Sequence, residues 1–194
     1  MMDDSLGLAA LCIEKGDSTG AAEHLGKHLQ AHPEQIMVRA YLAEILLKTK
    51  KLPEAQHQFE RFIAEAQDSN GPARKQALHC HTRLMEIAQD RDDSYAEHLH
   101  RGIGMVLLAR QLEGNIDRED VEPGFRERLL CKAVAELNKA KKLRPDEPRP
   151  HCYLVEAFKK LDQPRSAEKA AQTAKSLSAL LPLAPAEMHS LHMP

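Results

Sequence analysis

The chain has 194 residues and a formal net charge of −2, which gives no overall attraction to nucleic acid. Ala and Leu occur 26 times each, whereas Val, Ile and Thr together occur 16 times, and there is no Trp. Strands favour β-branched and aromatic residues, so this composition argues against an all-β fold and against a parallel α/β sheet. No apolar stretch approaches the roughly 18 residues of a membrane span. We expect an all-α protein of about nine helices.

The predicted helices are bounded by turn and capping residues. Gly16-Asp17-Ser18 ends one helix and can cap the next. Ser94-Tyr95-Ala96-Glu97 predicts a capping box, in which Ser94 and Glu97 accept hydrogen bonds from N–H groups in a first turn. Three prolines fall at first-turn positions, where the missing N–H costs nothing: Pro53, Pro72 and Pro164. In chain order the helices cover residues 5–15, 19–31, 36–49, 53–67, 72–89, 95–113, 126–143, 148–161 and 165–180.

An internal repeat of 34 residues is the strongest signal in the sequence. Leu8-Ala9 aligns with Leu42-Ala43 at this offset, and Ala21 aligns with Ala55. Late in the chain, Ala133 aligns with Ala167 at the same offset. Small residues at fixed points let two helices approach closely, and large apolar residues such as Leu8 and Leu42 belong to the buried stripe. The alternative is an ordinary helical bundle with chance spacing.

The period and these residue types resemble the tetratricopeptide repeat. The resemblance implies a right-handed solenoid of helical hairpins over residues 1–181, followed by a C-terminal tail over 182–194. The expected repeats are about 2–35, 36–69, 126–147 and 148–181, with an irregular region over 70–113 and an insertion over 114–125. The sequence Ile103-Gly104, followed by Leu107, looks like the large-small-large signature of a first helix, and we expect close helix packing at Gly104.

Two pairings of the middle helices remain open. The helix at 95–113 pairs with 126–143 if 72–89 is an unpaired spacer. Otherwise 72–89 pairs with 95–113. The sequence does not decide between them.

The histidines and cysteines are candidate metal ligands and redox groups. His24 and His28 lie four residues apart on a helix and His32 follows, but no carboxylate or thiolate set accompanies them. We therefore expect no metal and no cofactor. The four cysteines form no C-x-x-C pair, and the start of the chain is acidic, which together favour free thiols, no secretory signal and a cytoplasmic location.

The resemblance also implies a function. In such arrays the first helix of each pair lines a concave groove that holds a peptide or a partner's helix. A known clamp for C-terminal carboxylates is not expected, because Leu6 and Ala10 occupy its first-repeat positions. No nucleotide loop, nucleophile elbow or paired-carboxylate motif is present, so we expect no enzyme. The implied groove residues are Met37, Tyr41, Glu44 and Lys48, then His98, Arg101, Met105 and Leu108, and then Arg149, Tyr153, Glu156 and Lys160.

The regional charge suggests the kind of partner. Residues 1–97 carry a net −5, whereas residues 123–175 carry a net +6. Arg101, Arg149 and Lys160 are expected to form a basic cluster on the concave face, with Tyr153 and Met105 supplying apolar contact. We predict a protein-interaction adaptor or scaffold that binds an acidic segment with apolar anchors, with self-association possible and with neither nucleic acid nor membrane as partner. The alternative is a small chaperone of the same repeat type for a secreted or assembled client.

Overall fold

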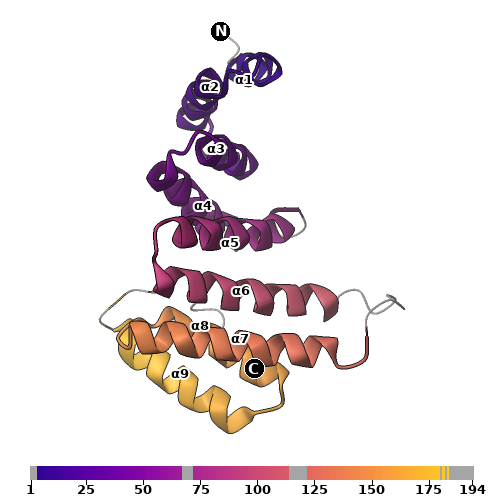
Figure 1. The fold of residues 1–194 in the computed structure, drawn as a ribbon, viewed down its shortest axis with the longest axis vertical. Helices are drawn as coiled ribbons and strands as arrows, with labels where there is room; N and C mark the ends of the chain where they lie inside the picture. The colour runs from indigo at the N-terminus through magenta and orange to yellow at the C-terminus, as the bar shows by residue number, and fades with distance from the viewer. Residues whose placement is uncertain (1–3, 67–71, 114–121, 180, 182, 184–194) are drawn as a thin grey trace. The chain divides into compact units, whose positions relative to one another are not determined.

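A computed structural model describes residues 4–66, 72–113, 122–179, 181 and 183. The described residues form nine α-helices and no strand, so the fold is all-α and of the helical-solenoid class, as predicted (Figure 1). Every predicted helix is present with its ends within two residues of the expected positions. The helices are α1 (Ser5–Glu14), α2 (Ser18–Ala31), α3 (Ile36–Lys48), α4 (Leu52–Ala66), α5 (Pro72–Asp90), α6 (Ser94–Glu113), α7 (Phe125–Leu143), α8 (Arg149–Lys160) and α9 (Pro164–Ser178).

The chain divides into two units, residues 1–80 and residues 81–194, and the division falls within α5. In the first unit, α1 packs on α2, α2 on α3, and α3 on α4. Ala21 and Ala55, which share a repeat position, are both completely buried, as the 34-residue spacing predicts. Small side chains at these points let the helix backbones approach, and Phe59 and Phe62 fill the core beside them.

In the second unit, α6 packs on α7, α7 on α8, and α8 on α9 (Figure 1). Ala133 and Ala167 are buried, again as the spacing predicts. The helices α6 and α7 approach closely at Gly102, where an added Cβ would lie 2.7 Å from Leu137 Cγ. Gly102 is buried and Gly104 is half-buried, and close packing at Gly104 stays a prediction.

The pairing of the middle helices is visible in the same contacts. Each of α1, α3, α6 and α8 packs on the helix that follows it. The helix α5 contacts α3 through His79 and α6 through His81 and Gln89. The buried residues of α5 are Ala73, Cys80, His81, Leu84, Ile87 and Ala88.

The residue that caps α2 is the one predicted from the sequence, whereas the residue that caps α6 is not. Asp17 Oδ1 accepts a hydrogen bond from Gly20 N at 2.9 Å and caps α2, after Gly16 has ended α1 with a φ of 76°. The capping box at Ser94 and Glu97 was wrong. Asp93 caps α6 instead, since its carboxylate accepts from Ala96 N at 3.0 Å, and Ser94 is already the first helical residue.

Part of the predicted insertion and most of the predicted tail lie outside the described residues, which exclude 114–121, 182 and 184–194. Leu183 is described, and it packs against the core of the second unit. No helix in the described part of the chain is long and apolar enough to cross a bilayer.

Candidate partner-binding surfaces

The α3 residues expected in the groove form a stripe along the helix. Met37, Tyr41, Glu44 and Lys48 are spaced by four, three and four residues, which places them on one side of an α-helix. Tyr41 is 64% exposed and Lys48 is also exposed. Neither side chain has a hydrogen-bond or ion-pair partner within the described residues. The stripe therefore presents an exposed aromatic ring and an available ammonium group.

Glu44, in the middle of this stripe, is engaged within the first unit. Its Oε1 lies 2.7 Å from Nε2 of His79 on α5. Burial, followed by the charge of Glu44, raises the pKa of the neighbouring Cys80 thiol to about 12. Cys80 is therefore a neutral packing residue, because only the thiolate is a strong nucleophile or metal ligand.

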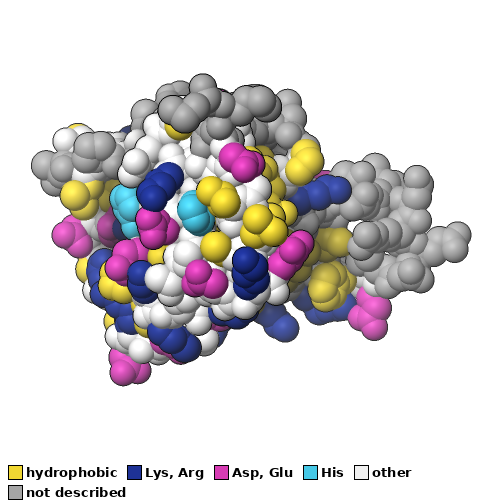
Figure 2. All heavy atoms as spheres, turned by 90° about the horizontal axis from the view of Figure 1, so that it is seen from above, with side chains coloured by type: hydrophobic (Ala, Val, Ile, Leu, Met, Phe, Trp, Pro, Cys, Tyr) yellow, Lys and Arg dark blue, Asp and Glu magenta, His cyan; other side chains and the backbone are white. Residues whose placement is uncertain are grey.

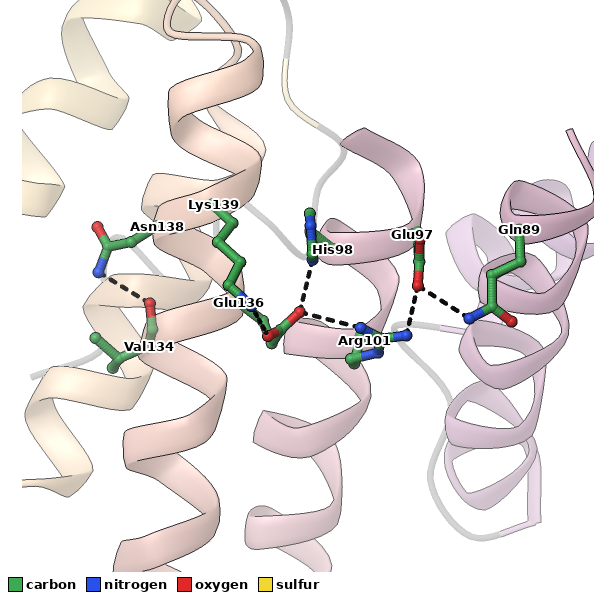
Figure 3. Close-up of polar contacts among 8 residues, drawn as sticks. All are labelled: Gln89, Glu97, His98, Arg101, Val134, Glu136, Asn138 and Lys139. Atoms are coloured by element: carbon green, nitrogen blue, oxygen red, sulfur yellow. Dashed lines mark hydrogen bonds and ion pairs between the residues drawn. The ribbon is translucent and has the colours of Figure 1, made fainter. Parts of the chain in front are cut away.

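On α6, two of the expected groove residues contact a carboxylate of α7 (Figure 3). Glu136 is buried, and one of its oxygens lies 2.7 Å from His98 Nδ1 and 3.4 Å from Arg101 Nη1. Its other oxygen accepts from Lys139 Nζ at 2.7 Å. Burial alone would raise the pKa of Glu136, but the hydrogen bonds from Lys139 and His98 outweigh it and hold the pKa below its usual value. Glu136 is thus an ionised anchor at the α6–α7 interface.

The network continues toward α5 through a second carboxylate (Figure 3). Glu97 accepts from Arg101 Nη2 and, at 2.9 Å, from Gln89 Nε2. The hydrogen bond from Gln89, and then the charge of Arg101, lower the pKa of Glu97. Arg101 is therefore held between two carboxylates. The other expected residues of α6, Met105 and Leu108, are partly buried and pack against the core of the second unit.

On α8 the expected groove residues face inward more than the sequence suggested. Tyr153 is 8% exposed and Glu156 is 6% exposed. Glu156 accepts two hydrogen bonds from Arg110 of α6, of which the one from Nε measures 2.9 Å. Lys160 Nζ donates to Glu113 of α6. These residues join α8 to α6.

The gathering of the three expected cations into one cluster stays a prediction. Arg101 contacts Glu136 of α7. On α8, Glu156 contacts Arg110 of α6, and Lys160 contacts Glu113 of α6. Arg101 and Arg110 are nine residues apart, which is about two and a half turns, so they leave opposite sides of the helix. Each of the three cations also has its own carboxylate, since Arg149 donates to Glu147 at 2.8 and 3.0 Å.

Sequence reasoning missed several of these groups. The Arg110–Glu156 pair has no local signal, because its members are 46 residues apart. Glu136 could have been found, since it lies three residues after Ala133 and four before Ala140, on the buried stripe of α7. His81 and His100 are both buried, and their Nδ1 atoms lie 3.0 Å apart across α5 and α6.

The candidate metal ligand His28 lies beside Gln35 and His32. His28 is 3% exposed, and its Nε2 lies 3.1 Å from Gln35 Oε1. The rings of His28 and His32 lie with their centroids 4.7 Å apart and are tilted by 34° to each other. Among the described residues no group of three or more His, Cys, Asp or Glu side chains is arranged to hold a metal ion.

A comparison with protein families identifies the repeat. The family model described as tetratricopeptide repeat matches residues 7–78. Over these residues the chain is similar to tetratricopeptide-repeat proteins. The matched tetratricopeptide repeats contain nearly all of α1, the whole of α2, α3 and α4, and the first turns of α5.

Solved structures that align with this chain are of low sequence identity. A MamA protein is 15% identical, with 93% of this chain and 94% of that chain covered and a TM-score of 0.43. MamA from Desulfovibrio magneticus RS-1, beginning at residue 41, is 13% identical, with 92% and 96% covered and a TM-score of 0.36. The assembly chaperone of RpL4 (Acl4) is 14% identical, with 98% and 84% covered and a TM-score of 0.36. No curated protein matches the chain.

Proposed function

We propose that this protein is a non-enzymatic adaptor or scaffold that binds a segment of another protein in a groove lined by the first helices of its repeats. Tetratricopeptide repeats are in general interaction modules, and the match over residues 7–78 supports that coarse function. The observation that carries the finer proposal is the exposure of Tyr41, which is 64% accessible in the middle of α3. Tyrosine is enriched at binding hot spots because it combines a large rigid apolar ring with a polar hydroxyl.

The proposed ligand carries an acidic side chain beside an apolar anchor. Lys48 lies seven residues after Tyr41, about two turns along the same side of α3. An apolar anchor can pack on the ring while a carboxylate reaches the ammonium group of Lys48. The cations of α6 and α8 are less suited to this role, because a ligand would have to displace Glu136, Glu147 or Glu113 from them. We therefore assign the preference for an acidic ligand side chain to Lys48. Arg101, Arg149 and Lys160 then contribute to the shape of the part of the groove formed by α6 and α8.

Site-specific photocrosslinking tests this proposal. A photoreactive phenylalanine analogue placed at Tyr41 should capture the partner in native lysate, and mass spectrometry should identify it. The matched control places the same analogue at Glu60, which is exposed on the second helix of the same repeat. Equal capture at both positions, or none at position 41, would contradict the groove.

Once the partner is known, charge reversal tests the contact with Lys48. Lys48→Glu should weaken binding several-fold, and the wild-type affinity should fall as salt rises. Lys51→Glu makes the same charge change at an exposed residue outside the stripe and should bind nearly as the wild type. A partner bound stably at one-to-one stoichiometry and released on its secretion or assembly would favour the chaperone alternative over a scaffold.

A further inference from the structure

The first helix leaves an unusual amount of apolar surface uncovered. Leu6, Leu8, Leu11 and Ile13 are between 39% and 51% exposed, and all four belong to the ten residues of α1. Hydrophobic side chains gather on the face of the molecule shown in Figure 2, among acidic and basic ones. At 100° per residue, Leu8 and Leu11 lie together on one side of α1, whereas Leu6 and Ile13 lie on the opposite side. A pair of adjacent exposed leucines on one side of a helix is a candidate interaction surface.

The internal repeat indicates what is missing from this surface. Leu8 and Leu42 occupy the same repeat position, yet Leu8 is 42% exposed and Leu42 is 6% exposed. The expectation that Leu8 is buried was therefore wrong. The physical reason is that α2 packs against α3, whereas no helix of the described residues covers the corresponding side of α1. Terminal repeats of solenoids normally carry a polar outer face at such a position.

Four residues form a continuous stripe on this uncovered side. Asp4, Leu8, Leu11 and Lys15 are spaced by four, three and four residues. Leu8 N donates to Asp4 O at 3.0 Å and Lys15 N donates to Leu11 O at 3.1 Å, so the helical ladder extends to both charged ends. Neither Asp4 nor Lys15 has an ion-pair partner among the described residues, and both are exposed.

The order of the stripe is self-complementary under a two-fold rotation. In an antiparallel pair of α1 helices, Asp4 of one copy lies opposite Lys15 of the other, and Leu8 lies opposite Leu11. Both pairings share one two-fold centre, midway between residues 9 and 10 of the helix. The spacing is also that of the seam along which two helices pack in a coiled coil. We propose that α1 is a homodimerisation helix, and that its outer stripe pairs antiparallel with the same stripe of a second copy of this chain.

A second copy fits this stripe better than a head-to-tail array of copies does. Such an array would place the last helix, α9, against α1, and α9 exposes mainly polar residues: Arg165, Glu168, Lys169, Gln172 and Lys175. Only the isologous arrangement satisfies both ends of the stripe at once, because residue i contacts j while j contacts i. Two leucines per copy bury much less surface than the roughly 800 Å² that each partner buries in a stable complex. We therefore expect weak, concentration-dependent dimerisation.

Charge-reversed variants test the orientation and the partner together. Sedimentation of the full-length chain should show self-association between about 10 μM and about 1 mM, a range set by the small interface. Asp4→Lys places two lysines opposite each other in the homodimer, and Lys15→Glu places two acids opposite each other. Each variant alone should dimerise at least several-fold more weakly than the wild type. An equimolar mixture of the two should regain wild-type association, because both ion pairs are then restored.

Glu14→Lys provides the control, since Glu14 is exposed and lies about a quarter-turn away from the stripe. Dimerisation of this variant should match the wild type. Circular dichroism of each variant shows whether α1 and the rest of the chain remain helical, and recovery in the mixture excludes misfolding independently. The proposal is overturned if the wild type stays monomeric over the whole range, if the mixture fails to recover, or if Glu14→Lys dimerises as weakly as the stripe variants.

Discussion

Arg110 of α6 binds both carboxylate oxygens of Glu156 on α8, and this bidentate pair lies inside the second unit rather than on an open groove. The side chain of Glu156 is 7% exposed and that of Arg110 is 30% exposed. A carboxylate this deeply buried is stable only because the guanidinium lies against it. The α8 face that sequence spacing assigns to ligand binding is thus used, at Glu156, to join two helices.

Removal of one partner of this pair should destabilise the second unit. Arg110→Ala leaves the Glu156 carboxylate buried without a counter-charge, at an expected cost of about 2–4 kcal/mol after allowance for the partial exposure of Arg110. Urea denaturation followed by circular dichroism measures the loss. Replacement of both residues, Arg110→Met with Glu156→Leu, should cost much less, and an equal loss in the single and double variants would contradict a role for the charge pair.

The buried pair of His81 and His100 should make stability depend on pH. Burial lowers the pKa of His81 to about 3, and burial together with the charges of His81 and Arg149 lowers the pKa of His100 well below its usual value of 6.5. Below pH 6.5 the unfolded chain takes up protons that the folded chain refuses. The stabilisation that comes from keeping the two histidines neutral in the folded state is therefore complete above pH 6.5. As the pH falls below that value, the free energy of unfolding decreases by about 1.4 kcal/mol per pH unit for each histidine.

Urea midpoints measured between pH 7.5 and pH 5 test the pair. The double variant His81→Leu with His100→Leu should show a clearly shallower slope than the wild type. It should keep part of the slope, because burial and then the charge of Lys141 lower the pKa of His151 also. His57→Gln changes an exposed histidine and should keep the wild-type slope. A wild-type slope in the double variant would show that the pair does not control the response.

Two glycines in helices should respond in opposite directions to the same substitution. A Cβ at Gly102 would lie 2.7 Å from Leu137 Cγ and 3.3 Å from the carbonyl oxygen of Ala133, both in a closely packed core. Gly102→Ala should therefore cost about 1–3 kcal/mol through overpacking. At Gly26 of α2 a Cβ would meet nothing within 4 Å, so Gly26→Ala should stabilise by roughly 0.5–1 kcal/mol. Thermal melts of both variants compare them directly, and stabilisation by both would place the α6–α7 contact elsewhere.

The helices and the fold class could be predicted from sequence because their signals are local. Apolar periodicity, prolines in first turns and the Asp17 cap act within a few residues, and the 34-residue offset of Ala21 and Ala55 identified the repeat. The capping box at Ser94 was wrong by one residue, because Asp93 offers a carboxylate at an equally suitable spacing. The close approach of α7 at Gly102 was not predicted, because spacing alone does not show which side of α6 faces α7.

The candidate surfaces were less predictable, for a different reason. The position of Tyr41 in its repeat placed it on the lining face, and its exposure agrees with that assignment while leaving its role a proposal. The cations Arg101, Arg149 and Lys160 could be placed on helices, but their neutralising carboxylates come from residues up to 47 positions away. Regional net charge does not reveal such pairs.

The sequence by itself determined the helices, their boundaries and the repeat that stacks them, because these follow from hydrophobic periodicity and backbone capping over short distances. Only the tertiary structure decided which charged residues are buried in pairs and which apolar residues remain uncovered. Leu8 and Leu42 are both leucines at the same repeat position. Whether each side chain is buried depends on the presence of a neighbouring helix, which no local pattern specifies.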